Sequence, residues 1–256
     1  MSETGWPERF WGPETLDPAA WAELTPLLDT REEIEALVGA LVGVASIADV
    51  GGGTGLLTRA LAARVAPVVV VEPSAAQRAV LDGVREARIR CVAGRAERVP
   101  LGEGAVDAAM ATWVLQYTED PVQAVRELAR VARTRVVIVQ AAARNDLVDV
   151  YNEEAQVAGL ACAHHGWLLA RAREVLEERG FAVESSVVPT PVAAPPGGAA
   201  QLAEVLARLH FAGHPEVGEM RRATEGMIAA RLAAGGGALR DDGEMLVGTR
   251  PSTRPR

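Results

Sequence analysis

The densest group of residues that could do chemistry lies between Ala48 and Gly55 and reads Ala-Asp-Val-Gly-Gly-Gly-Thr-Gly. Glycines lack Cβ atoms, so the backbone can turn tightly there and a ligand can lie against its N–H groups. Asp49 places a carboxylate directly before this turn, and Glu72 places a second one 21 residues after Gly51. A carboxylate at that separation can accept hydrogen bonds from both hydroxyls of a ribose. The pattern therefore predicts a nucleotide-binding corner.

The spacing of the glycines selects among nucleotide ligands. A dinucleotide-binding turn needs glycines at positions 51, 53 and 56, whereas this chain has them at 51, 53 and 55, followed by Leu56. The carboxylate of Glu72 does not discriminate, because nicotinamide and adenosyl ligands both carry a ribose. The turn therefore disfavours an NAD-dependent oxidoreductase.

Short apolar runs alternate with helix-starting signals around this corner. A first strand is expected at 44–50, directly before the glycines, and a helix should follow from Leu56. The second strand, at 68–71, is a run of valines, as in strands that are buried on both faces. Further strands are expected at 89–93, 106–112, 135–140, 181–188 and 244–249. Strands alternating with helices predict an α/β fold around a parallel sheet with right-handed crossovers.

Composition excludes several classes of partner. The net charge of −8 argues against a nucleic-acid partner, because binding to phosphates needs a basic face. Two cysteines form neither a disulfide framework nor a metal-binding motif, so no metal site is expected and a reducing cytoplasm is favoured. No apolar stretch reaches the length of a membrane span, and residues 1–10 lack the apolar core of a signal peptide.

Three more patterns follow the glycine turn in order and at the expected spacing. They are Gly94-x-x-Glu97-x-x-Pro100, the strand start at Val106-Asp107, and the run from Asp120-Pro121 to Val131. Together with 49–55 they resemble successive motifs of the small-molecule class I S-adenosylmethionine (SAM)-dependent methyltransferases, over about residues 40–140. The resemblance implies a Rossmann-like, seven-stranded, mostly parallel sheet with helices on both faces and an antiparallel last strand. It also implies SAM as the cofactor and S-adenosylhomocysteine (SAH) as the product.

The resemblance also implies roles for single residues. The glycines would let the methionine part of SAM approach the backbone, Asp49 would order that loop or the amino group, and Glu72 would hold the ribose. The implied cofactor-binding set is Asp49, Gly51, Gly52, Gly53, Gly55, Glu72, Pro73, Arg95, Ala96, Glu97, Thr112 and Trp113. Arg95 departs from the family, which usually has an acid there, because Arg cannot accept a hydrogen bond from the adenine amino group. Glu97 or a backbone carbonyl would replace the acid, or Arg95 would stack on the purine.

Methyl transfer is an in-line displacement that depends on positioning and desolvation, and it needs a base only if the nucleophile arrives protonated. The candidate bases are His164, His165, His210, His214, Tyr117 and Tyr151. Of these, His165, His164 and Tyr151 are preferred as catalytic residues, because the family often places substrate-facing groups after the fifth strand. The expected substrate-binding residues are Trp11, Trp113, Gln116, Tyr117 and Trp167.

The chain is expected to divide into a core and helical additions. Residues 1–30 carry Trp6, Phe10, Trp11 and Trp21 and should form a lid or a clamp, since aromatic rings shape apolar pockets. Residues 31–190 should form the SAM-binding core, which the last strand at 243–250 completes. A helical insertion is expected at 191–242, near the mouth of the active site or in a dimer contact, and a disordered tail at 251–256.

These patterns predict a methyltransferase acting on a small molecule, such as a specialised metabolite or a modified peptide. Oxygen is favoured as the acceptor atom, because the sequence shows no acidic cluster that would handle an amine. Two alternatives stay open: an enzyme that uses bound SAM for a decarboxylation or a cyclisation, and a binding or scaffold protein without catalysis. The chain could be a monomer or a homodimer, since the apolar helix around Leu202 could form an interface or cover the sheet.

Overall fold

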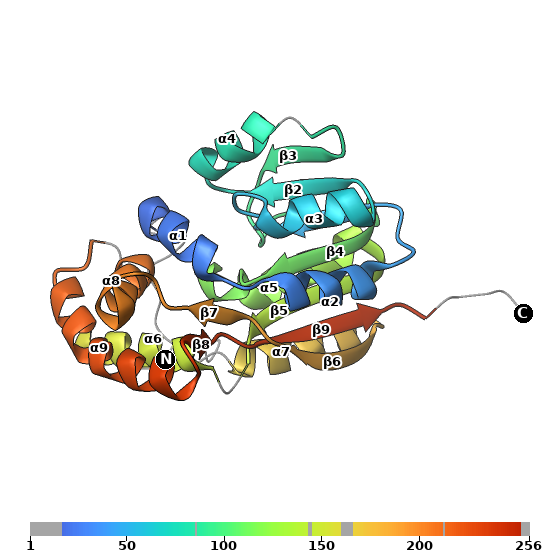
Figure 1. Cartoon of the computed structure of the whole chain (residues 1–256). Helices are drawn as coiled ribbons and strands as arrows, with labels where there is room; N and C mark the ends of the chain where they lie inside the picture. The colour runs from blue at the N-terminus through green and yellow to red at the C-terminus, as the bar shows by residue number, and fades with distance from the viewer. Residues whose placement is uncertain (1–16, 85, 143–144, 160–165, 212, 252–256) are drawn as a thin grey trace, which may run out of the picture. The chain divides into compact units, whose positions relative to one another are not determined.

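The computed structural model describes residues 17–84, 86–142, 145–159, 166–211 and 213–251 (Figure 1). The chain folds into two compact units. The first, here called the sheet unit, comprises 33–140, 167–188 and 244–256. The second, the helical unit, comprises 1–32, 141–166 and 189–243. Both units are built from segments that are separated along the chain, so each is described by itself.

The sheet unit contains a seven-stranded sheet in the order β3-β2-β1-β4-β5-β9-β6. Strands β1 to β5 are parallel, and β9 runs in the opposite direction to them (Figure 1). This confirms the predicted fold class. The strands are β1 (Ile47–Val50), β2 (Val68–Glu72), β3 (Ile89–Ala93), β4 (Val106–Thr112), β5 (Ala132–Ala141), β6 (Ala182–Val188) and β9 (Gly243–Thr249).

Helices cover both faces of this sheet. Leu37 of α2, Leu61 of α3 and Leu81 of α4 join one buried apolar cluster with side chains of the strands, while α5 and α7 lie behind the sheet in Figure 1. The burial of β1 is complete because its residues have strands on both sides and helices above and below. The helices are α2 (Arg31–Leu41), α3 (Leu56–Arg64), α4 (Ala75–Val84), α5 (Pro121–Val131) and α7 (Gly166–Glu178), with a 3-10 turn η3 (Leu115–Tyr117).

The helical unit has its own core. Helices α8 (Gly198–His210) and α9 (Val217–Ala234) pack against each other and against α6 (Asp146–Val157), and α1 (Pro18–Leu24) packs on α8. A short antiparallel pair joins them, made of β7 (Pro191–Ala193) and β8 (Ala238–Arg240). A helical insertion was expected from residue 191, but this segment begins with the strand β7. Pro191 is compatible with a strand because it stands at its first position, and Val192 is completely buried.

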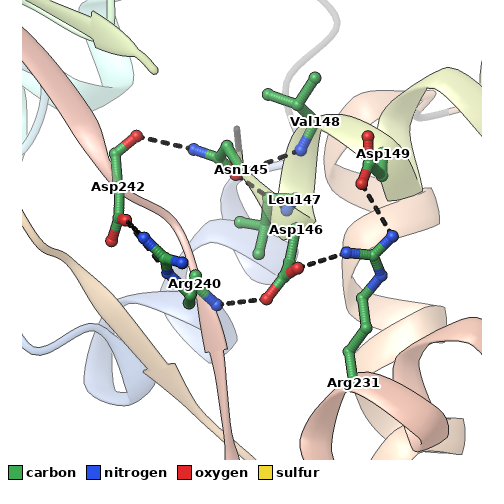
Figure 2. A network of polar contacts seen from close by, with 8 residues as sticks. All are labelled: Asn145, Asp146, Leu147, Val148, Asp149, Arg231, Arg240 and Asp242. Carbon is green, nitrogen blue, oxygen red and sulfur yellow. Dashed lines mark hydrogen bonds and ion pairs between the residues drawn. The ribbon is translucent and has the colours of Figure 1, made fainter. Parts of the chain in front are cut away.

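The segment 141–166 groups with the helical unit, whereas the sequence had assigned it to the core. The reason is that α6 packs on α9 and α8. A polar network holds the start of α6 in place (Figure 2). Arg231 pairs with Asp146 and, at 2.8 Å, with Asp149, and the backbone N–H of Arg240 donates to Asp146 Oδ2 at 2.7 Å. Asp242 pairs with the Arg240 guanidinium.

In the part of the chain that the structure describes, no helix combines the length and the apolar character needed to cross a membrane.

Candidate functional site

The glycine turn lies at the carboxyl end of β1, where the parallel strands end. Gly51, Gly53 and Gly55 all have positive φ angles, of 78°, 57° and 83°, which residues other than glycine rarely adopt. Space excludes a side chain as well, because a Cβ on Gly51 would lie 2.5 Å from Val114 Cγ2 and one on Gly55 would lie 2.2 Å from Leu81 Cδ2. The turn therefore requires these glycines, and its backbone stays open to a ligand.

Asp49 lies beneath the turn and is buried. Its Oδ2 accepts a hydrogen bond of 2.5 Å from the Thr58 hydroxyl. Burial raises the pKa of the Asp49 carboxyl to about 6, against the hydrogen bond from Thr58, and the neighbouring carboxylate of Glu72 adds to the rise. Within the described part of the chain, its second oxygen, Oδ1, is buried and has no hydrogen-bond partner. Asp49 therefore keeps acceptor capacity for a donor group.

Glu72 ends β2 and connects the two turns of the site. Its Oε2 accepts from the Gly53 N–H at 3.1 Å, and its Oε1 accepts from the Ser74 N–H at 2.8 Å. Burial raises the pKa of this carboxyl, while the two backbone donors oppose the rise. The side chain is thus fixed at the strand end, and lone pairs on both oxygens remain for hydroxyl donors.

The turn after β3 carries Arg95, Ala96 and Glu97. Arg95 Nη2 lies 3.2 Å from Glu119 Oε1, and Arg95 Nε lies 3.5 Å from Glu97 Oε2. Glu97 Oε1 also accepts from the Glu119 N–H at 2.7 Å. These contacts join the turn to the segment before α5 and balance the charge of Arg95 with two carboxylates. Ala96 is buried between these residues.

Trp113 follows β4 and has a φ of 58°, the one positive value at a non-glycine residue among those described. Its indole Nε1 donates to Glu33 Oε1 at 2.8 Å, and the Glu33 side chain is buried in α2. The strained backbone places Val114 against Gly51. Trp113 therefore packs with the core cluster and supports the glycine turn, in addition to any contact with a ligand.

The structure brings together most of the predicted cofactor positions. Asp49, the glycines, Glu72 and Pro73 meet at the ends of β1 and β2, and Thr112 ends β4, which pairs with β1. Gln116 and Tyr117 lie in η3, and Gln116 Oε1 is a buried oxygen without a partner in the described residues. Trp167 is half-buried at the start of α7 in the sheet unit. Tyr151 belongs to α6 of the helical unit. Trp11, His164 and His165 lie outside the described residues.

Sequence reasoning missed several residues that shape the site. Four such residues lie next to its key residues: Thr58, Gln77, Glu33 and Val114. For example, Gln77 Oε1 would lie 2.9 Å from a Cβ built on Gly53. Thr58 could have been found, because it stands one helical turn into α3 and faces the strand end. The others come from distant parts of the chain, and no local pattern indicates them.

Comparisons with known proteins agree with this geometry. Residues 48–139 match the family described as "Methyltransferase domain". Residues 48–139, within the sheet unit, therefore form a methyltransferase domain. An uncharacterized methyltransferase of Mycobacterium tuberculosis is 39% identical over 89 residues, which is 34% of this chain and 35% of that protein. The chain therefore matches about a third of the length of this curated relative.

Two solved structures resemble the whole fold. The YcgJ protein of Bacillus subtilis has a TM-score of 0.62 at 15% identity and covers 86% of this chain and 98% of its own. A protein of Anabaena variabilis, described as a methyltransferase from an antibiotic biosynthesis pathway, has a TM-score of 0.60 at 20% identity. This match covers 85% of the present chain and 96% of the Anabaena chain. At these identities the likeness shows the fold.

The residues of the methyltransferase domain fit SAM. The Oδ1 of Asp49, which has no partner among the described residues, suits an ammonium group, and the fixed carboxylate of Glu72 suits two ribose hydroxyls. The positive φ angles of the glycines allow the tight backbone turn that lies next to these two carboxylates. When bound, SAM supplies a methyl group on a positively charged sulfur. The two buried carboxylates complement that positive charge. Among the described residues, no group of three or more histidine, cysteine or acidic side chains could hold a metal ion.

Proposed function

We propose that the whole protein is a methyltransferase that transfers the methyl group of SAM to a hydroxyl oxygen of a small molecule. The observation that carries the proposal is the pair of buried carboxylates, Asp49 and Glu72, at a glycine turn that admits no side chain. This chain's own residues bind and orient: Glu72 accepts a hydrogen bond from the Gly53 N–H, and the Val114 side chain lies next to Gly51. Such positioning supplies most of the catalysis in a displacement that needs no covalent help from the protein.

A small molecule fits the acceptor side better than a nucleic acid does. The chain has a net charge of −8, which repels a phosphate backbone. Gln116, in η3 shortly after β4, has a buried carbonyl oxygen without a hydrogen-bond partner among the described residues, and such an oxygen can accept a hydrogen bond from a ligand. We infer a substrate-binding role for Gln116 and Tyr117 from their place after β4, and the same role for Trp167.

The first experiment is thermal unfolding with SAM, with SAH and with NAD. A ligand at 100 times its Kd stabilises the folded state by about 2.7 kcal/mol. For a chain of this length that corresponds to a rise in Tm of about 5–10 °C. SAM and SAH should both produce this shift and NAD should produce none. A protein that shifts with none of the three would contradict the proposal.

Transfer of labelled methyl groups from SAM then separates methylation from the alternatives. Label should appear in an acceptor of the hydroxyl class, and SAH should accumulate in equal amount. Tight SAH binding without transfer to any acceptor would favour an enzyme that uses bound SAM for another reaction. Light scattering of the same sample distinguishes a monomer from a homodimer, and the proposal favours neither of the two.

A further inference from the structure

Two buried carboxyl groups lie at the glycine turn of the sheet unit. Asp49 is 1% exposed and Glu72 is 5% exposed. The Thr58 hydroxyl donates to Asp49 Oδ2, and the other oxygen of Asp49, Oδ1, has no hydrogen-bond partner among the described residues. Burial raises the pKa of the Asp49 carboxyl to about 6, against the Thr58 hydrogen bond, and the charge of Glu72 adds to the rise. The ionised form of Asp49 is therefore held by one hydroxyl, in a buried site beside a second acid.

Within the part of the chain that the structure describes, no positively charged side chain is paired with Asp49. On the neighbouring strands Asp49 pairs with Val70 of β2 and Met110 of β4, which do not titrate. Arg59 and Arg78 both donate to backbone carbonyls. Besides Glu72, the charged and titratable groups that face the two carboxyls or bond to residues supporting the turn are Glu33 of α2, Arg59 of α3, Arg78 of α4 and Cys91 of β3.

The backbone of the turn rests directly on the Asp49 carboxyl. A Cβ built on Gly52 would lie 2.8 Å from Asp49 Oδ2, while residues 51–54 are half-buried. A ligand on the turn would thus be separated from Asp49 by one layer of backbone. Opposite charges attract across such a distance without contact, because a buried site screens them less than water does. A positive group of the ligand would therefore favour the ionised form of Asp49.

We propose that the positive charge of the ligand's amino group replaces a proton on Asp49, so that binding of SAM or SAH releases this proton. The inference rests on the proposed function, since it takes SAM as the ligand of the turn. The O–H bond of the Asp49 carboxyl breaks, its electron pair stays on the oxygen, and the proton goes to the buffer. A protonated Asp49 carries no charge that would attract the amino group. Binding should therefore weaken as pH falls, and Asp49 should favour ligands that carry an amino group.

Calorimetric titration of the full chain with SAH, in pairs of buffers with different heats of ionisation, counts the protons released. The amino and carboxyl groups of SAH keep their charges between pH 5 and 7. At pH 6 about half a proton should be released for each SAH bound, because about half of the Asp49 carboxyls are then protonated. At pH 8 almost none should be released. The Kd for SAH should rise about tenfold from pH 7 to pH 5. Binding without proton release at pH 5 and 6 would overturn the proposal.

Three variants assign the proton to Asp49. Asp49→Asn should bind SAH more weakly, release no proton at pH 6 and keep the same Kd at pH 5 and pH 7. Thr58→Val removes the hydrogen bond that favours the ionised form, so it should release more protons at pH 7 than the unmodified protein does. Asp107→Asn is the matched control, at an acid of the same sheet whose partners lower its pKa, and it should leave the release unchanged. Equal release by Asp49→Asn and the unmodified protein would overturn the proposal. If Asp49→Asn does not fold, a release by Thr58→Val at pH 7 that is no larger than that of the unmodified protein would overturn it.

A second ligand tests the role of the amino group. 5′-Methylthioadenosine has the nucleoside and the sulfur of SAH but no amino group, so it should bind without releasing a proton. Release equal to that with SAH would overturn the proposal. SAH that binds at no pH would contradict the proposed function and this inference together. Proton release on SAH binding, without methyl transfer to any acceptor, would contradict the proposed function alone.

Discussion

At the scale of single residues, Gly51 is a position that does not tolerate a side chain. Its φ of 78° costs an alanine about 1–2 kcal/mol, and the added Cβ would lie 2.5 Å from Val114 Cγ2. We expect Gly51→Ala to lower the free energy of unfolding by about 1–3 kcal/mol and to weaken SAH binding at least tenfold. Urea unfolding and calorimetric titration measure the two effects.

Gly39 provides the matched control for this substitution. It is exposed in the last turn of α2, and a Cβ there would meet no atom within 4 Å. Gly39→Ala should therefore stabilise the protein by about 0.5–1 kcal/mol, since alanine is the better helix former. Its SAH affinity should stay unchanged. Equal SAH binding by both variants would show that the glycine turn does not contact the cofactor.

The pKa of Asp49 predicts how stability depends on pH. Its carboxyl has a pKa of about 6 in the folded protein and an ordinary value of 3.8, so between these values the folded chain binds more protons than the unfolded chain. The free energy of unfolding should therefore fall as pH rises from about 4 to 6, by up to about 3 kcal/mol from this group. Asp49→Asn should remove that fall, as urea unfolding at a series of pH values would show.

For Asp107 the contribution to stability should change with pH in the opposite direction, so this residue serves as the comparison. The Ala45 N–H and the Arg133 guanidinium hold the pKa of the Asp107 carboxyl below its usual range. Its contribution to stability is present above pH 4 and disappears as pH falls through the lowered pKa. Asp107→Asn should thus reduce stability at neutral pH and flatten the acid limb of the profile. If both substitutions changed the slope of the free energy of unfolding against pH in the same direction, burial would not explain the raised pKa of Asp49.

The sequence predicted the residues of the site that follow one another along the chain. Asp49, the glycines and Glu72 were recognisable because a strand, a turn and a helix set their spacing locally. The hydrogen bond from Trp113 to Glu33 was not, because it joins residues 80 positions apart. In the sequence, Glu33 stands three residues after Thr30, which is the spacing of a helix-capping pair. Its burial beside Trp113 depends on how α2 packs on the sheet, which no local pattern contains.

At the scale of elements, the N-cap residue of α6 does more than satisfy the first backbone N–H groups of the helix. Asn145 Oδ1 accepts from the backbone N–H groups of Leu147 and Val148, and its Nδ2 donates to the Asp242 carbonyl at 2.9 Å (Figure 2). A typical cap contributes about 1 kcal/mol, and each buried group left unpaired adds about 1–3 kcal/mol. Asn145→Ala should therefore destabilise α6 by about 2–4 kcal/mol, measured as faster hydrogen exchange of its amides.

Asp120 is the control cap, at the start of α5. Its Oδ1 accepts from the Gln123 N–H at 2.9 Å, and the residue is exposed, so water can replace the lost partner. Asp120→Ala should cost only about 0.5–1 kcal/mol. If the two variants accelerated exchange in their helices equally, the hydrogen bonds that Asn145 Nδ2 donates to Asp241 Oδ1 and to the Asp242 carbonyl would contribute nothing to stability.

Elements with strong local signals were predicted almost to their ends, as β3 and β4 show. The pair β7 and β8 was missed, because a proline-rich run and three glycines hide two strands of three residues each. Such short strands form only where distant segments meet: Val192 is buried among apolar side chains of α1, α6, α8 and α9. These strands form because of tertiary packing and not because of the intrinsic strand propensity of their residues.

At the scale of the whole molecule, the division into two units was only partly visible. A single insertion at 191–242 was expected, but the helical unit also includes 1–32 and 141–166. The sequence could not show this, because α6 has the ordinary features of a helix following a strand. Its assignment depends on contacts with α9, about 70 residues further along the chain.

Two units with separate cores should respond separately to ligands. SAH should slow hydrogen exchange at 49–55 and 72–77, where the backbone N–H groups of Gly53 and Ser74 bind Glu72, because a ligand suppresses local opening of the residues it holds. Amides of α8 and α9 should keep their rates when SAH is added alone. Protection of α8 by SAH, with unchanged rates at the glycine turn, would contradict the assignment of the cofactor to residues 49–55 and 72–77.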